Sequence, residues 1–340
     1  MKFTDLVDKF RGDLEEAGAA VLIASRGPRP AHLRVLTEAG SHDCLVYLWT
    51  ITHGGGPARP ADEWRVQMTL GDPKVILLPP RQVTILGGWS PEFGVYAFWD
   101  AGCHGGQVSH SPSLQIRAGT LAEAARSRVM TEHRDVTAGR ECMVAVTPDS
   151  LLWYVQEGRA IHRVAEDVLV HVPRLMDASV AEEAHLVEEA EGYVERARRH
   201  ELVQLMRPWR DATFRKRVLD AYGNRCAVCR TSLRLVDAAH IVPVTEPDAS
   251  DEVANGVALC RLHHGAYDMA LLGVMEDYSV EVNQRVARQL QVAGRADGLQ
   301  SFRDALPGRI VVPDRRALRP NPRNLARGLE VRGWPRPHTP

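Results

Sequence analysis

Two short motifs with metal-binding residues lie about thirty residues apart in the last third of this 340-residue chain. The first is a C-x2-C pair, Cys226 and Cys229, and the second is a C-x2-H pair, Cys260 and His263. Two such half-sites, each on a tight turn, supply the three thiolates and one imidazole that Zn²⁺ takes in closed tetrahedral sites. The sequence therefore predicts a structural zinc site that joins the two turns.

A second set of polar residues is interleaved with these cysteines, and a structural zinc does not need them. His240 ends an apolar, strand-like run at 233–242, where a neutral imidazole can take a proton from water. Asn255 follows, and His264 falls on the expected first turn of a helix. Asp268 lies four residues beyond His264, on the same helix face. Two ligands at this spacing form a partial divalent-cation site that leaves positions for water and phosphate.

The order His, Asn, His inside a C-x2-C…C-x2-H frame resembles the HNH nuclease family over roughly residues 210–275. The stretches AAHIVP, NGVALC and HHGAYD carry the resemblance. It implies a β-hairpin and a helix around a metal, with His240 as general base, His264 as a metal ligand and Asn255 positioning the base or its loop. The implied catalytic metal is Mg²⁺ or Mn²⁺, with Ni²⁺ or Co²⁺ as alternatives. Asp268 as the second ligand is inferred from spacing.

One position departs from the family pattern. Many members carry Asp or His immediately before the base, where that residue binds the metal, but this chain has Ala239. The nearest acid, Asp237, is three residues before the base and on the opposite face of an ideal strand. A bulge, or Asp268 alone, would have to compensate.

Length and composition suggest a two-domain globular protein. The chain is 44% hydrophobic and 25% charged, with a net charge of −1, so any DNA-binding face must be a local patch. We see no signal peptide and no membrane span. Three of the six cysteines belong to the zinc frame, and the rest are scattered, which favours a reducing cytoplasm over a disulfide scaffold.

Residues 1–170 are expected to form a mostly β domain that recognises DNA. An amphipathic helix opens it, a second helix is expected at 120–130, and short strands separated by Gly and Pro are expected at 45–52, 63–69, 74–80, 82–89, 93–100, 113–119, 141–147 and 151–157. The arrangement THGGG…DEWR…LGGW…GVYAFWD…SPSLQI resembles, more loosely than the nuclease core, a domain found in front of HNH restriction proteins and near DNA methylases. That resemblance implies target recognition.

Residues 171–208 are expected to form a helical linker, and residues 209–340 an HNH domain with an Arg- and Pro-rich tail. The charged stretch 179–205 has helical spacing, and an ordinary surface helix fits it as well as a spacer. Beyond Asp268, a strand pair and a helix at 283–294 are expected. The fold class is α+β, with a zinc-stabilised ββα-metal domain at the C-terminal end.

Several arginines are candidates for nucleic-acid contacts. Arg230 and Arg261 lie inside the zinc turns, whose backbones are fixed, and Arg59 and Arg117 lie beside polar loops of the first domain. The basic run 215–217 could neutralise the DNA backbone, although a solvated helix face is the simpler explanation for each of its residues.

The function that these residues favour is a metal-dependent endonuclease that cleaves double-stranded DNA. We expect a cytoplasmic restriction enzyme, type II or modification-dependent, acting against foreign DNA, with a cognate DNA methyltransferase and a homodimer among the partners to be tested. The alternative is a zinc-stabilised DNA-binding or regulatory protein that does not cut. His240, Asn255 and His264 together separate the two hypotheses, because a zinc module alone has no use for all three.

Overall fold

The structure is a computed structural model that describes residues 1–37, 40–55, 60–108, 112–164, 166–177, 196–246 and 249–334. The chain divides into two compact units, Met1–Trp209 and Arg210–Pro340. Helix and sheet are mixed in both units, which confirms the α+β class. Among the described helices, none combines the length and apolar character that crossing a membrane requires.

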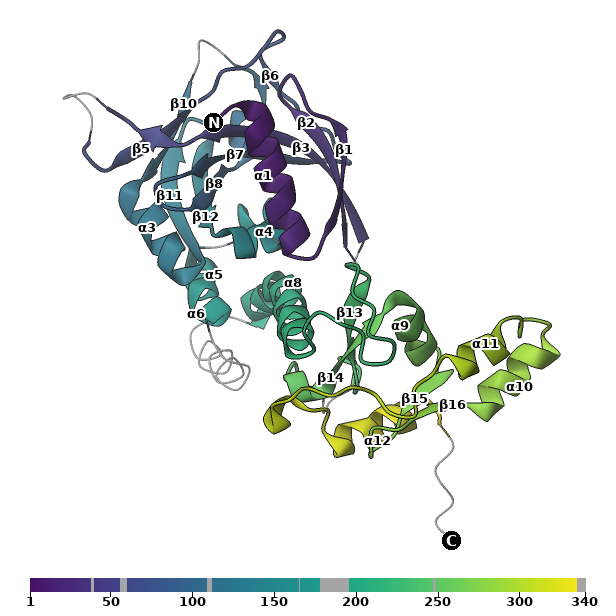
Figure 1. The fold of residues 1–340 in the computed structure, drawn as a ribbon. Coiled ribbons are helices and arrows are strands. Elements are labelled where there is room, and N and C mark those ends of the chain that lie inside the picture. The colour runs from purple at the N-terminus through teal and green to yellow at the C-terminus, as the bar shows by residue number, and fades with distance from the viewer. Residues whose placement is uncertain are drawn as a thin grey trace. The chain divides into compact units, whose positions relative to one another are not determined.

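The first unit is built on a seven-stranded sheet in the order β1-β2-β3-β7-β8-β12-β11 (Figure 1). Neighbouring strands are antiparallel, except that β3 and β7 are parallel. The strands are β1 (Ala20–Ser25), β2 (Ala31–Thr37), β3 (Gly40–Thr50), β7 (Val83–Ser90), β8 (Val95–Trp99), β11 (Val129–Val136) and β12 (Gly139–Val146).

Smaller elements complete this unit. A three-stranded sheet orders β10 (Ser113–Arg117), β5 (Glu63–Gln67) and β4 (Thr52–His53), and β6 (Val75–Ile76) pairs with β9 (Gly106–Gln107). The helical segments are α1 (Phe3–Glu16), α2 (Ala101–His104), α3 (Ala118–Ser127), η1 (Pro148–Ser150), α4 (Leu151–Ile161), α5 (Glu166–Leu169), α6 (Val172–Asp177) and the first part of α8 (Arg196–Ala221).

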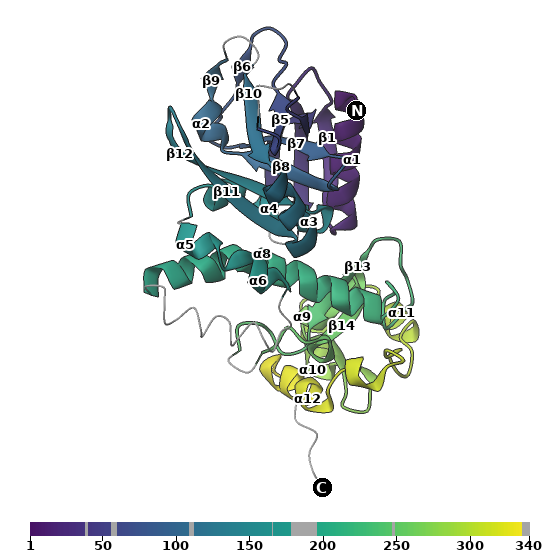
Figure 2. The ribbon, with the colours of Figure 1, turned by 90° about the vertical axis from the view of Figure 1, so that its left-hand side faces the viewer.

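Strand β3 shows why this sheet is buried on both faces. Its alternate residues enter two separate apolar clusters, one with Val46 and Leu48 and the other with Tyr47 and Trp49. Helix α1 covers the first face with Leu6, Val7, Phe10 and Leu14, and Figure 2 shows it beside the sheet. Strands that are apolar on both sides read as continuous hydrophobic runs, which is how LVYLWTIT appears in the sequence.

Two expectations for this unit are corrected. The run at 151–157 is not a strand but the first part of α4, in which Leu151, Trp153 and Val155 are all buried. Because nearly every side of this helix is buried, its residues show no period that separates helix from strand. Strands β1, β2 and β11 were not expected, and the predicted strand at 74–80 is reduced to β6.

The second unit contains the ββα arrangement that the HNH resemblance implied. Strands β13 (Val236–His240) and β14 (Gly256–Cys260) form an antiparallel pair, and α9 (Arg261–Asp268) follows β14 directly. The later part of α8 packs on them through Phe214, Val218 and Tyr222. The expected strand pair and helix beyond Asp268 are present. This unit also contains η2 (Val253–Asn255), β15 (Leu272–Val274), β16 (Val280–Val282), α10 (Gln284–Val292), α11 (Leu299–Asp304), η3 (Arg316–Leu318) and α12 (Pro322–Val331).

The helix predicted at 179–205 lies largely outside the described residues, and its described part belongs to α8. Helix α8 continues through Pro208 to Ala221, so 196–221 is one helix. A proline inside a helix removes one backbone donor, and the helix continues through it here. The unit boundary falls within this helix, between Trp209 and Arg210.

Helix α4 gives a test of the packing in the first unit. The Trp153 side chain is 1% exposed, and its indole Nε1 donates a hydrogen bond of 2.7 Å to the Leu205 carbonyl of α8. We expect Trp153→Ala to lower the free energy of unfolding by about 3–5 kcal/mol, because it leaves a cavity and removes a buried hydrogen bond. Urea unfolding measures the loss. The control is Leu22→Ala on β1, whose side chain is exposed. Equal losses of unfolding free energy in the two variants would show that Trp153 is not buried as described.

Candidate active site

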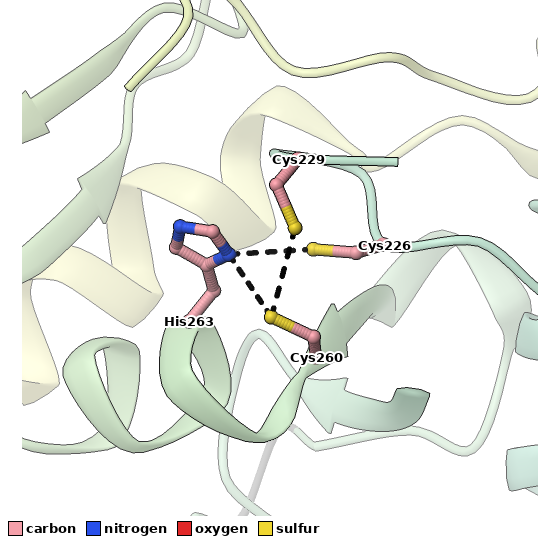
Figure 3. A group of neighbouring side chains, drawn as sticks. All are labelled: Cys226, Cys229, Cys260 and His263. Carbon is pink, nitrogen blue, oxygen red and sulfur yellow. Dashed lines mark hydrogen bonds between the residues drawn. The ribbon is translucent and has the colours of Figure 1, made fainter. Parts of the chain in front are cut away.

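The four predicted zinc ligands converge in the second unit, and they come from three segments (Figure 3). Cys226 and Cys229 lie on the turn between α8 and β13, Cys260 ends β14, and His263 lies on the first turn of α9. The turn is fixed by its own backbone, since the Arg230 N–H donates to the Cys226 carbonyl at 3.0 Å. The spacing of the two pairs thus predicted a real cluster.

The geometry of this cluster fits a tetrahedral metal. The His263 Nδ1 lies 3.5 Å from the Cys226 Sγ and 3.1 Å from the Cys260 Sγ, and the Sγ atoms of Cys229 and Cys260 are 3.7 Å apart. A tetrahedron with zinc–ligand bonds of about 2.0–2.3 Å has edges of about 3.3–3.8 Å. The distances of 3.5 and 3.7 Å lie within this range, and the distance of 3.1 Å is slightly shorter. Three thiolates with one imidazole are also a donor set that zinc favours.

His240 is the last residue of β13, and two contacts fix its ring. The imidazole lies flat on the Phe214 ring, with centroids 3.7 Å apart and an interplanar angle of 12°. Its Nε2 lies 3.0 Å from the Asp251 Oδ1, so that a proton on Nε2 is shared with this carboxylate. The side chain of His240 remains 19% exposed, which leaves the ring accessible to water.

Asp251 stays ionised opposite His240. The hydrogen bond from His240 lowers the pKa of Asp251 below its ordinary value, and the positive charges of Arg210 and Arg217 act in the same direction, while partial burial opposes them. Arg217 also donates a hydrogen bond to the Asp251 backbone carbonyl at 3.2 Å. A carboxylate held in this way orients an imidazole and stabilises its protonated form.

Gly256 explains how Phe214 comes so close to the base. It pairs with His240 across the β13–β14 ladder. A Cβ at this position would lie 2.4 Å from the Val218 Cγ2 and 2.9 Å from the Phe214 Cζ. A side chain there would push α8 away from the hairpin, and so the glycine is required for the stacking of Phe214 on His240.

Asn255 is buried and holds the loop that follows His240. Its Oδ1 accepts a hydrogen bond from the Val242 N–H at 2.9 Å, and its Nδ2 donates to the Val242 carbonyl at 3.1 Å and to the Ser250 carbonyl at 2.8 Å. Every polar atom of the amide is therefore used within the protein. These contacts tie the end of the base strand to the residue that precedes Asp251, and they fit the positioning role implied by the resemblance.

His264 and Asp268 face each other on α9 as their spacing predicted. The His264 Nε2 lies 3.4 Å from the Asp268 Oδ2, and the Asp268 side chain is 57% exposed. Two such atoms can share one cation. Over the residues that the structure describes, no group of three or more His, Cys, Asp or Glu ligand atoms within 4.8 Å of one another exists apart from the zinc frame. A cation bound here would complete its shell with water and phosphate oxygens.

Asp237 does not replace the missing ligand before the base. It is 2% exposed, its Oδ1 accepts a hydrogen bond of 2.7 Å from the Arg215 Nε, and its Oδ2 lies 3.6 Å from an Nη of Arg261. The carboxylate therefore joins α8 to the first turn of α9, and it supports the hairpin from the other side.

Each residue of the basic run on α8 has a partner within the protein. Arg215 pairs with Asp237, Lys216 pairs with Asp220 at 3.1 Å, and Arg217 holds the Asp251 carbonyl. Lys216 and Asp220 are exposed, as in a solvated helix face, and neutralisation of the DNA backbone by this run stays a prediction.

Two of the four arginines predicted to contact nucleic acid lie in the second unit. Arg230 and Arg261 have exposed side chains in the zinc turns. Arg117 lies in the first unit, where its exposed side chain has its Nε 3.8 Å from the Glu132 Oε1. Arg59 lies outside the described residues.

Sequence reasoning missed Asp251 as the partner of the base. It stands in a polar stretch with several acids, PDASDE, and nothing in the spacing distinguishes it from Asp248 or Glu252. Only the fold of the loop, pinned by Asn255, selects it.

Comparison with known proteins agrees with this geometry. Residues 226–275 match the model of the family described as HNH endonuclease, and residues 42–155 match that described as Methylase-associated X1. The second unit therefore contains an HNH nuclease domain, and the first contains a methylase-associated region. A search among curated proteins found no match. Among solved structures, the chain aligns with a "Modification dependent TagI restriction endonuclease" at a TM-score of 0.30 and 13% identity, covering 86% of this chain and 81% of that one.

The zinc frame gives a prediction about folding. Cys226→Ser removes a buried thiolate, and we expect it to unfold the second unit, because a closed zinc site supplies folding free energy directly. Thermal melting together with zinc content per chain measures the effect. Cys103→Ser, at a cysteine outside the cluster, is the control. A Cys226→Ser variant that melts like the wild type would show that the frame holds no structural metal.

Proposed function

We propose that this protein is a metal-dependent endonuclease that hydrolyses phosphodiester bonds of double-stranded DNA and acts in restriction of foreign DNA. The observation that carries the proposal is the setting of His240, whose ring is stacked on Phe214 and joined by one nitrogen to Asp251 within a stretch that matches the HNH endonuclease family. A base fixed in this way has its second nitrogen available for a substrate water.

The reaction needs a deprotonated water, and His240 is the group that removes the proton. With a proton on Nε2 donated to Asp251, the Nδ1 lone pair accepts a proton from the attacking water. The positive charge that develops on the ring is stabilised by the ionised carboxylate of Asp251. The water oxygen then forms the new bond to phosphorus, and the bond to the leaving oxygen breaks.

The second half of the site would hold the catalytic cation, with His264 and Asp268 as its protein ligands. When bound, a divalent ion such as Mg²⁺ or Mn²⁺ offsets the charge that builds on the phosphate and on the leaving oxygen. Asn255 keeps the base loop in register, and Cys226, Cys229, Cys260 and His263 hold a structural zinc that fixes the hairpin to α9.

The placement of the methylase-associated region supports a restriction role. Residues 42–155 precede the nuclease domain in one chain, so that recognition by residues 1–170, a linker at 171–208 and cleavage by residues 209–340 would form one polypeptide. Arg230, Arg261, Arg117 and Arg59 are the proposed DNA contacts. A cognate methyltransferase would protect host DNA in the cytoplasm. Because one HNH centre cuts one strand at a time, cutting of both strands would favour a homodimer.

The first test removes the base. We expect His240→Ala to lower the single-turnover rate of plasmid cleavage in Mg²⁺ or Mn²⁺ by about 10²–10⁴-fold, the usual contribution of a general base. The substrates are matched unmodified and modified plasmids, and gel electrophoresis separates nicked from linear products. His32→Ala, at an exposed histidine of the first unit, is the control.

Two outcomes would contradict this proposal. Cutting by His240→Ala at the wild-type rate would remove His240 from the mechanism. Binding of DNA by the wild type without cleavage of any substrate would instead favour a zinc-stabilised DNA-binding protein.

The second test concerns the partner of the base. Asp251→Asn keeps the size of the side chain but removes the charge that stabilises protonated His240, and we expect kcat to fall by about 10–100-fold with little change in KM. Asp297→Asn makes the same change at an exposed position of the same unit and should leave kcat unchanged. Equal rates for the two variants would show that Asp251 has no part in the chemistry.

A further inference from the structure

Helix α12 lies against the end of the base strand. At its start, the Asn321 N–H donates to the carbonyl of Ala254 at 2.9 Å, one residue before Asn255. Further along, a Cβ on Gly328 would lie only 2.4 Å from the Ile241 carbonyl oxygen, so that no larger residue fits between α12 and the residue after His240. Arg327 pairs with Glu246 of the loop beyond, at 2.7 Å.

Arg332, at the end of α12, contacts both halves of the proposed active site. Its Nη1 donates to the Ile241 carbonyl at 2.6 Å, and its Nη2 donates to the His240 carbonyl at 2.9 Å. The same Nη2 lies 3.9 Å from the Asp268 Oδ1, and the guanidinium carbon lies 4.2 Å from the centre of the Tyr267 ring. One side chain thus joins the backbone of the base to the helix that carries His264 and Asp268.

The chemistry of this contact requires arginine. The planar guanidinium of Arg332, with its donors in a fixed fork, contacts two carbonyls, an aromatic face and a carboxylate. A lysine ammonium cannot reproduce this set of contacts. The Arg332 side chain is 9% exposed, and hydrogen bonds from a charged donor are stronger where water is excluded. These contacts are therefore directional. They fix the distance between the end of β13 and α9, and do more than add buried surface.

We infer that Arg332 is a positioning residue of the nuclease centre, which holds the strand end of His240 in fixed relation to the metal-binding face of α9. The inference rests on the proposed nuclease function. Rates of phosphodiester cleavage depend steeply on the placement of base and cation around one phosphate. Arg332 touches neither the water nor the phosphate in this account, and it acts through His240 and α9.

The experiment compares two changes at this position with a matched one on the same helix. We expect Arg332→Gln to lower kcat by roughly 10–100-fold with KM for DNA within about twofold, the range found for residues that orient catalytic ligands. Arg332→Lys keeps the charge and one hydrogen bond, and its kcat should be intermediate. Arg323→Gln removes one exposed positive charge from α12 and should leave kcat unchanged. Zinc content and thermal melting are measured for each variant.

A wild-type kcat in Arg332→Gln would overturn the inference, and so would an equal loss in Arg323→Gln, which would assign the effect to charge. If Arg332→Gln does not fold, Arg332→Lys decides in the same way. The imidazole NMR resonances of His240 add a readout that does not need activity. We expect them to move in Arg332→Lys; wild-type resonances would reject the positioning role. If the wild-type protein cuts no DNA, the proposed function fails, and these resonances still test Arg332.

Discussion

The second unit depends on one constraint, which is that three separate chain segments meet at a single cluster of four ligands. Strands β13 and β14 are five residues each, and a two-stranded hairpin of this size is marginal in water. The ligands join the turn before β13, the end of β14 and the first turn of α9. Because the hairpin and the helix are held at these ends, the residues further along β13 and α9 have defined positions.

Around this frame, each candidate catalytic group is supported by a second residue with one evident task. Phe214 and Asp251 fix the ring of His240, Gly256 makes room for Phe214, and Asn255 closes the loop that brings Asp251 back. The polar groups of the supporting residues make hydrogen bonds within the protein, whereas the side chains of His240 and Asp268 remain partly exposed. This arrangement of buried supporting residues and exposed catalytic groups suits a site in which rigid internal contacts orient the few groups that face substrate.

The sequence was informative where the chemistry is local. Two residues separate the zinc ligands within each pair, and His264 and Asp268 are one helical turn apart, so spacing alone predicted both groups. Asp251 reaches the site through a loop, and Arg332, which is 92 residues after His240, reaches it from the end of α12. No short-range pattern marks such contacts. Arg215 and Arg217 show the same limit, because the sequence does not reveal that one pairs with the buried Asp237 and the other with the Asp251 carbonyl.

The parallel pairing of β3 with β7 has a consequence for how the first unit is made. Strands β1, β2 and β3 are neighbours along the chain and can pair in turn as they are synthesised. The other edge of β3 has its partner only after the chain has passed through β4, β5 and β6 to reach β7. Until then, a nascent chain on the ribosome carries an open strand edge rich in apolar residues, the kind of surface that invites wrong pairing. The edge of β3 that pairs with β7 is therefore the later of its two edges to be covered as the chain is synthesised.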